Sequence, residues 1–247
     1  MDKNKIYFAS DFHLGSPSID ESRKRERIII RWLNSIEKDA KKIYLLGDIF
    51  DFWFEYKKVI PKGFVRLLGK LAELSDNGIE IHLFAGNHDL WIKDYLKYEI
   101  GININHKCLL IKECGLDILV GHGDGLGKGD YSYKILKRIF TSKVCQWAFA
   151  RIHPNLAFSL AHLWSNKSRK NEGKNNFSTK EKEIIYGYCK SQQSISPIDY
   201  YIFGHRHLPL EIKIDKKSTY INTGDWIEHY TYAVLENKKV QLKSFKV

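Results

Sequence analysis

The stretch KIYLLGDIFD, residues 42–51, holds the most informative pattern in this 247-residue chain. Residues 43–46 form a short, β-prone apolar run that ends at Gly47, and Asp48 follows at once. A carboxylate in that place lies at the carboxyl end of a buried strand, where open α/β sheets have their binding sites. The stretch therefore predicts a functional carboxylate at a sheet edge.

The same arrangement recurs four more times along the chain. Apolar runs at 6–9, 81–86, 117–121 and 200–204 each lead into polar side chains. In an extended segment, residues two apart face the same way and can share one ion. A single such motif is common by chance, but five in order predict one metal site assembled from separate strand ends. Its members are Asp11 and His13, Asp48, Asn87, His122, and His205 and His207.

These seven side chains offer oxygen and nitrogen ligands and no sulfur. They are too many for one tetrahedral zinc ion and suit two octahedral ions, with Asp48 as the bridge. Mn²⁺ is the first choice, and Fe²⁺, Zn²⁺ and Mg²⁺ are the alternatives. Two ions about 3.5–4 Å apart can clamp the attacking and leaving oxygens of a displacement at phosphorus. The motifs therefore favour phosphoryl chemistry.

Composition indicates a chain with a substantial core and no membrane span. Hydrophobic residues make up 43% of it, enough for one large domain or two small ones. No run approaches the ~18 apolar residues of a membrane span, and the N-terminus lacks a signal peptide's apolar stretch. The four cysteines show no CxxC spacing, which argues against a zinc ribbon and favours reduced thiols in the cytoplasm.

The net charge of +11 is concentrated in one segment. Residues 125–190 contain 13 Lys and Arg against 4 Asp and Glu, a net of +9. Such a block attracts nucleic acid, anionic lipid or phosphate-bearing substrates, or serves only as a solubilising surface. Apolar residues at helical spacing over 136–152 and 156–164 predict a helical insertion at about 125–190, over the strand ends. A capping box at Ser178 and Glu181 predicts a further helix there.

Two helices are expected before the insertion. One is capped by Ser18 or Asp20 and extends to residue 36, and the other begins at Pro61 and ends before Asn77. With the strands they give the alternation of a layered α/β domain. The aromatic residues at 50–56 predict either core packing beneath the sheet or a wall for an apolar ligand group.

The five motifs resemble those of the calcineurin-like metallophosphoesterases. That resemblance implies a β-sandwich flanked by helices, in a single domain of residues 1–247 with the helical lid insertion inside it. It implies one ion held by Asp11, His13, Asp48 and His207, and a second held by Asp48, Asn87, His122 and His205. It also implies that His88, oriented by Asp89, steadies the transition state or protonates the leaving oxygen.

A narrower resemblance rests on residues 47–53, on 122–126 and on the basic insertion. These are similar to a branch of the family that cleaves the pyrophosphate of an acylated UDP-sugar in lipid A biosynthesis. The likeness implies a cytoplasmic protein, peripheral to the inner face of the inner membrane, with an anionic membrane surface as partner. This chain departs from that branch at His88, where the best-known members have Arg. The implied substrate contacts are Asp130, Tyr133, Ser168, Arg169 and Lys174.

Three other functions are compatible with the motifs. A nuclease or phosphodiesterase of this fold would use the basic residues on a nucleic-acid backbone and the aromatic residues on bases. The helical spacing places many of these aromatic residues with Leu and Ile, which favours an apolar pocket over nucleic acid. A phosphoprotein phosphatase has no feature in its favour. A scaffold without catalysis is disfavoured because all seven ligands and His88 are present. The oligomeric state stays open.

Overall fold

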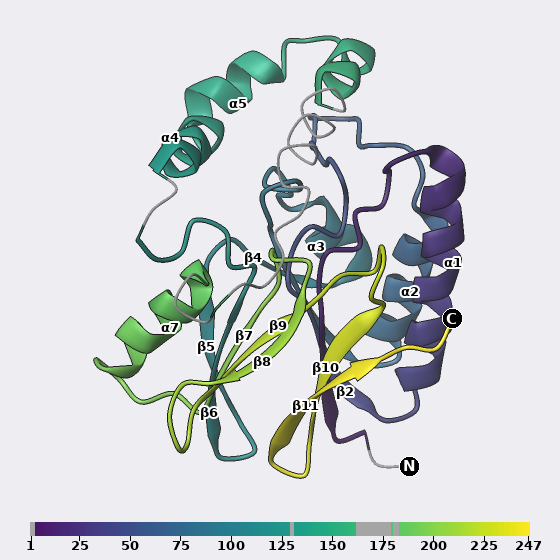
Figure 1. Cartoon of the computed structure of the whole chain (residues 1–247). Coiled ribbons are helices and arrows are strands. Elements are labelled where there is room, and N and C mark those ends of the chain that lie inside the picture. The colour runs from purple at the N-terminus through teal and green to yellow at the C-terminus, as the bar shows by residue number, and fades with distance from the viewer. Residues whose placement is uncertain (1–2, 129–130, 162–178, 180–182) are drawn as a thin grey trace.

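The computed structural model describes residues 3–128, 131–161, 179 and 183–247. Two β-sheets pack face to face between helices (Figure 1). The first sheet contains β1 (Lys5–Ala9), β2 (Ala40–Leu45), β3 (Glu80–Phe84), β4 (Asn103–Asn105), β10 (Thr231–Glu236) and β11 (Lys239–Ser244). The second contains β5 (Leu109–Glu113), β6 (Leu116–Gly121), β7 (Tyr200–Phe203), β8 (Pro209–Lys213) and β9 (Thr219–Thr223).

Parallel pairing brings the ends of the motif strands to one edge of each sheet. The strand orders are β11-β10-β1-β2-β3-β4 and β5-β6-β7-β9-β8. Strands β1 to β4 are parallel neighbours, and so are β6, β7 and β9. The loops after β1, β2 and β3 therefore leave the first sheet on one side, as those after β6 and β7 leave the second. The predicted layered α/β fold is confirmed.

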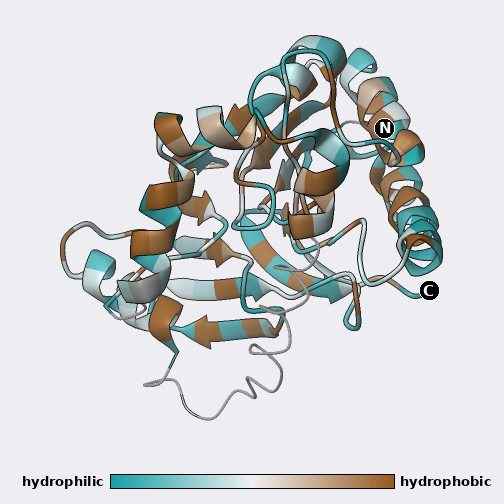
Figure 2. Cartoon of the chain, turned by 90° about the horizontal axis from the view of Figure 1, so that it is seen from above, coloured by the Kyte–Doolittle hydropathy of each residue, from teal (hydrophilic) through white to brown (hydrophobic). Residues whose placement is uncertain are grey.

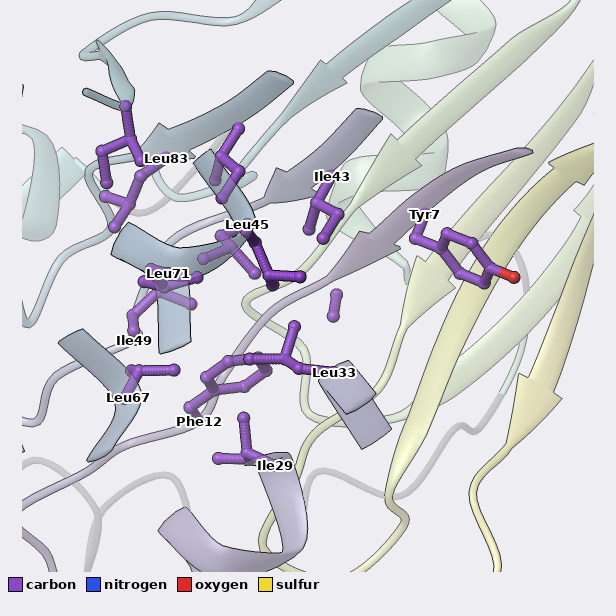
Figure 3. Packing of buried hydrophobic residues seen from close by; sticks show 14 of the residues in the cluster. Tyr7, Phe12, Ile29, Leu33, Ile43, Leu45, Ile49, Leu67, Leu71 and Leu83 are labelled. Carbon is purple, nitrogen blue, oxygen red and sulfur yellow. The ribbon is translucent and has the colours of Figure 1, made fainter. Parts of the chain in front are cut away.

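Three apolar layers hold the sheets and helices together. Phe8 and Tyr44 stack at 5.3 Å between the two sheets. On the outer face of the first sheet, α1 (Ile19–Ile36) and α2 (Val65–Asp76) bury residues such as Leu33 and Leu71 (Figure 3). Each fully buried side chain of this kind stabilises the fold by about 1.5–3 kcal/mol. Helix α7 (Ile184–Gln193) covers the second sheet through Ile185.

The first helix begins as predicted, but the second does not. Ser18 is the N-cap of α1, and its hydroxyl accepts a hydrogen bond from the Glu21 N–H at 3.2 Å. The expectation that Pro61 opens the second helix is wrong, because Phe64 lies in the left-handed region at φ 56° and α2 begins only at Val65. A carboxylate oxygen of Glu26 on α1 accepts the N–H of Leu67 at 3.0 Å and so caps α2 from outside.

The insertion is helical but more broken than its apolar spacing predicts. The single helix expected over 136–152 is two helices, α4 (Tyr131–Phe140) and α5 (Lys143–Phe149), because Ser142 between them is extended. Residues 154–161 form another helix, so Pro154 begins a helix, as its fixed φ allows at a first position. Figure 1 shows α4 and α5 beyond the strand ends. Ser178, Glu181 and Trp164 lie outside the described residues.

The rest of the chain adds a short helix and a hairpin. Helix α3 (Tyr95–Ile100) precedes β4, and the hairpin predicted near residue 236 joins β10 to β11. Hydrophobic and hydrophilic stretches alternate along the helices and strands (Figure 2). Among the described helices, none is both long enough and apolar enough to cross a membrane.

Candidate metal centre

Backbone hydrogen bonds join the loops that carry the predicted ligands. The N–H of Asp11 donates to the carbonyl of Gly47 at 3.0 Å, and the N–H of His13 donates to that of Asp48 at 2.9 Å. The N–H of Gly204 donates to the carbonyl of His122 at 2.9 Å. Loops from different strands are thus fixed relative to one another by the main chain itself.

The ligand-bearing loops turn sharply instead of continuing as strands. Asp11 and His13 have φ values of 57° and 43°, so the extended geometry assumed for this pair does not hold. Asp48, His205 and His207 also have positive φ, between 53° and 70°. Asp and His tolerate this region better than most residues do, but each instance costs about 1–3 kcal/mol. The turns direct these side chains towards the gap between the loops.

A first group of donors gathers around Asp11. One ligand atom from each of Asp11, His13, Asp48 and His207 lies within 4.8 Å of the others. The Nε2 atoms of His13 and His207 are 3.1 Å apart, and Oδ1 of Asp11 lies 3.4 Å from Nε2 of His207. That Oδ1 atom is buried and has no hydrogen-bond partner within the described residues. A buried carboxylate oxygen without a donor is suited to a cation.

A second group gathers around Asn87 and shares Asp48 with the first. Asp48, His122 and His205 form another set of convergent donors. Oδ1 of Asn87 lies 3.0 Å from Nε2 of His122 and 3.0 Å from Nδ1 of His205. The Leu46 carbonyl accepts the Nδ1–H of His122 at 2.8 Å, which directs Nε2 into the group. All seven predicted ligands are therefore brought together, in the two sets expected.

The electrostatics of the centre favour added positive charge. Burial lowers the pKa of His122, but the carboxylate of Asp48 outweighs burial and raises that pKa to about 10. Burial likewise opposes the charged form of His13, yet the nearby carboxylates of Asp11 and Asp51, at 3.7 Å and 3.6 Å, raise its pKa to about 10. Three buried carboxylates, those of Asp11, Asp48 and Asp51, thus attract cationic charge. The donor set, oxygen and nitrogen without sulfur, fits a pair of divalent cations.

The centre leaves little space around its ligands. A Cβ atom built on Gly86 would overlap the carboxylate of Asp48 and would lie 2.6 Å from its backbone nitrogen. On Gly47, where φ is 92°, it would lie 2.6 Å from Nδ1 of His122. Because Gly47 after β2 and Gly86 after β3 have no side chain, Asp48 and His122 can approach each other.

His88 lies beside the first group, and its partner differs from the predicted one. Its ring centroid is 4.7 Å from that of His13, and its Nδ1–H donates to the carbonyl of Asp51 at 3.1 Å. The carboxylate of Asp89 instead accepts the N–H groups of Gly86 at 2.7 Å and Ile49 at 2.8 Å. Asp89 therefore holds the loops after β2 and β3, and the main chain of Asp51 orients His88.

Two supporting residues were missed by sequence reasoning. Nη1 of Arg25 on α1 donates to the carbonyls of Phe12, His13 and Ser16 at 2.8–3.1 Å and holds the first loop. Asp225 lies with Oδ2 3.5 Å from Nδ1 of His207. Neither residue belongs to a recognisable sequence motif. In the sequence, a buried Arg on a helix such as Arg25 looks the same as an exposed one. His13, Asp51 and His88 form a third convergent set that the sequence also did not suggest.

The aromatic exit of β2 is divided between the core and the insertion, so the expected core packing is confirmed for part of it. Phe50 and Trp53 are buried in the core. Phe52 instead contacts the insertion, with its ring centroid 6.1 Å from Phe149 and 5.3 Å from Phe158. We call Phe52, Phe54, Trp91, Phe149 and Phe158 the aromatic wall. Phe52 directly follows Asp51, whose carbonyl accepts the Nδ1–H of His88, so the wall begins one residue from the centre.

The implied substrate contacts are only partly described by the structure. The hydroxyl of Tyr133 on α4 donates to the carboxylate of Asp124, and its ring lies 6.5 Å from that of His205. Tyr133 is therefore beside the second group. Asp130, Ser168, Arg169 and Lys174 lie outside the described residues.

The sequence profile described as calcineurin-like phosphoesterase matches residues 4–209, and the chain belongs to that family. The predicted family and the predicted class of enzyme, a metal-dependent hydrolase, are thereby confirmed. The chain is similar to a Porphyromonas gingivalis protein named UDP-2,3-diacylglucosamine hydrolase, with 38% identity over 99% of this chain and 98% of that protein.

Two more distant similarities accompany that one. A protein of the same name from Histophilus somni is 24% identical over 90% of this chain and 92% of its own length. Among solved structures, the phosphoesterase Yfce from E. coli aligns with 97% of this chain and 92% of its own, at 14% identity and a TM-score of 0.48.

Proposed function

We propose that this chain hydrolyses the pyrophosphate of UDP-2,3-diacylglucosamine to UMP and 2,3-diacylglucosamine 1-phosphate, a step of lipid A biosynthesis. The observation that carries the proposal is the pair of donor groups sharing Asp48, next to an aromatic wall. Carboxylate and imidazole donors suit phosphate chemistry, and the wall suits acyl chains. The similarity to the Porphyromonas protein supports the choice of substrate.

In this proposal Asp11, His13, Asp48 and His207 hold one divalent cation, and Asp48, Asn87, His122 and His205 hold a second, with Mn²⁺ as the first candidate. When bound, the two cations supply positive charge to the phosphate oxygens. His88, protonated on both nitrogens, donates the Nε2 proton to the leaving oxygen, while its Nδ1–H is donated to the carbonyl of Asp51 and fixes the ring. Asp89 keeps the loops in place. Asp130, Tyr133, Ser168, Arg169 and Lys174 are the proposed substrate contacts.

Product identification tests the proposed reaction directly. The chain is incubated with Mn²⁺ and UDP-2,3-diacylglucosamine, and the products are identified by mass spectrometry. The proposal expects UMP and 2,3-diacylglucosamine 1-phosphate in equal amounts. A second candidate is a nuclease, since bases could stack on the aromatic wall. Cleavage of a single-stranded oligonucleotide, with the acylated substrate left intact, would favour that candidate.

Phe149 should contribute to binding of the acylated substrate only. Replacing it by alanine is expected to lower kcat/KM for UDP-2,3-diacylglucosamine about ten- to a hundredfold, because one aromatic contact of about 1.5–3 kcal/mol is lost. The kcat/KM for bis(p-nitrophenyl) phosphate, which is too small to reach the aromatic wall, should change less than about twofold. Trp147 is unsuitable for this test because its side chain is 61% exposed.

Tyr98→Ala is the matched control for Phe149→Ala. Its ring is 77% exposed on α3, so its loss should leave both activities unchanged. Equal losses on both substrates in the Phe149 variant would indicate a general defect and would remove the wall from substrate binding.

We further propose that the insertion contacts an anionic membrane surface from the cytoplasmic side. Ile135, Val144 and Trp147 on α4 and α5 are 61–73% exposed. Exposed Arg151 stacks on the Trp147 ring at 4.7 Å. An exposed apolar surface with cationic residues is typical of helices that lie in the membrane interface.

Vesicle flotation tests this contact. Changing Ile135 and Trp147 together to serine is expected to lower the affinity for phosphatidylglycerol vesicles at least about tenfold, because two apolar side chains leave the membrane. Ile195→Ser, at a site 78% exposed after α7, is the control and should have no effect. Equal flotation of all three proteins would contradict the proposal.

A further inference from the structure

A pocket of about 560 Å³ adjoins the metal centre on the side of His122. It lies among the end of β3, the segment between β4 and β5, the loop after β6, and helices α4 and α7. Its volume falls in the range of small-molecule sites, about 300–1,000 Å³. None of the residues assigned to the metal ions other than His122 lines it. Besides His122 and the thiol of Cys108, the charged and polar side chains that line it are His106, Lys107, Asp124, Lys134, Lys137 and Tyr188.

The pocket presents hydrogen-bond donors and a net positive charge. Its carboxylate, Asp124, already accepts from the Tyr133 hydroxyl and forms an ion pair with Lys137 at 2.5 Å. The ammonium group of Lys134 donates to the carbonyl of Gly127. Lys107 forms no ion pair with any residue that the structure describes and is exposed at the edge. A ligand for this pocket should therefore be negatively charged and rich in acceptors.

Helix α4 separates this pocket from the aromatic wall. Near its start, Tyr133 contacts Asp124 in the pocket, and Lys137, about one turn further on, contacts it too. At the other end, the carbonyl of Phe140 accepts the indole N–H of Trp91 at 2.7 Å. Phe140 is seven positions after Tyr133 on α4, a rise of about 10 Å along the helix. Two chemically different walls thus flank the centre, one basic and one apolar.

We propose that the basic pocket holds the nucleoside-phosphate half of the substrate while the aromatic wall takes the acylated half. This assignment rests on the proposed function, in which a pyrophosphate joins two such halves. A uridine phosphate offers the carbonyl oxygens of its base, its ribose oxygens and its phosphate, so most of its polar atoms are acceptors. Lys107, with three donors and no ion pair among the described residues, is placed to contact the base or ribose.

Calorimetric titration of the Mn²⁺-loaded protein tests the assignment without requiring turnover. The ligands are UMP, inorganic phosphate and glucosamine 1-phosphate. UMP is expected to bind at least about tenfold more tightly than either of the others, since only UMP fills the pocket. Lys107→Ala should weaken UMP binding at least about fivefold and leave phosphate binding unchanged. Lys112→Ala, which removes the same charge from a side chain 77% exposed on β5, should alter neither.

Three results would overturn the assignment. They are equal affinities for UMP and phosphate in the wild type, equal affinities for UMP and glucosamine 1-phosphate, and equal weakening of UMP and phosphate binding by Lys107→Ala. The last would show a general charge effect. Hydrolysis of UDP-2,3-diacylglucosamine is measured separately. Its absence, with UMP binding that depends on Lys107, would overturn the proposed function and support the nucleotide pocket.

Discussion

Replacing Asp48 by asparagine is expected to lower kcat at least about a hundredfold while the protein stays folded. Asp48 belongs to both donor groups, and its Oδ2 lies 3.7 Å from Nε2 of His13 and 3.3 Å from Nε2 of His122. The change removes a charge that two cations would share, at almost unchanged volume. A hundredfold loss corresponds to about 2.7 kcal/mol of barrier. Steady-state kinetics with saturating Mn²⁺ measure it, together with metal content per chain.

The control for this change is Asp20→Asn. That side chain is 85% exposed in the first turn of α1, so kcat and metal content should equal those of the wild type. Circular dichroism then verifies that both variants fold. An Asp48 variant that retains more than about a tenth of the wild-type kcat, or two bound ions per chain, would contradict a shared bridging role.

His88→Ala is the second change with a large expected effect. We expect kcat to fall by roughly 10²–10⁴ with metal content unchanged, because the imidazole acts on the leaving oxygen and is not one of the seven ligands. A substrate with a good leaving group, such as bis(p-nitrophenyl) phosphate, should lose much less than UDP-2,3-diacylglucosamine, since p-nitrophenolate needs little protonation. The measurement is the fall in kcat on each of the two substrates, and the ratio of these two falls tests the role of His88.

His82→Ala controls for loss of a partly buried imidazole, because His82 lies on β3 itself and His88 in the loop that follows it. His82 stacks on Tyr44 at 4.7 Å and contacts Glu80, away from the donor groups, so only stability should change. If the His88 variant binds fewer ions, His88 is a ligand or a support of Asn87. If both substrates lose equally, general acid catalysis by His88 is contradicted.

The polar groups at the strand ends made the centre predictable from the sequence. Short apolar runs followed by Asp48 or His122 specify buried strands, and parallel strands bring their carboxyl ends to one edge. The grouping around Asp48 then required only the family resemblance. The start of α2 could not be predicted, because its first N–H groups are capped by Glu26 from another helix. The break at Ser142 is equally hidden by continuous apolar spacing.

The roles of supporting residues were harder to predict than the ligands. Asp89 follows His88 directly, which suggested that it orients the imidazole, but its carboxylate faces the N–H groups of Ile49 and Gly86. Arg25 is 12 residues from His13 in the chain, and only the folded turn after β1 shows that it holds the carbonyl of His13. Such contacts depend on tertiary geometry, and residue type and spacing do not determine them.

The left-handed backbone at Asp11, His13, Asp48, His205 and His207 limits how this centre could be transplanted. A designer who copied only the seven side chains onto another α/β scaffold would leave them pointing along ordinary strands. The turns themselves must be copied, with Gly47 and Gly86 beside them and Arg25 to hold the first loop. The backbone conformation of these loops therefore defines the centre, and the seven ligand side chains depend on it for their positions.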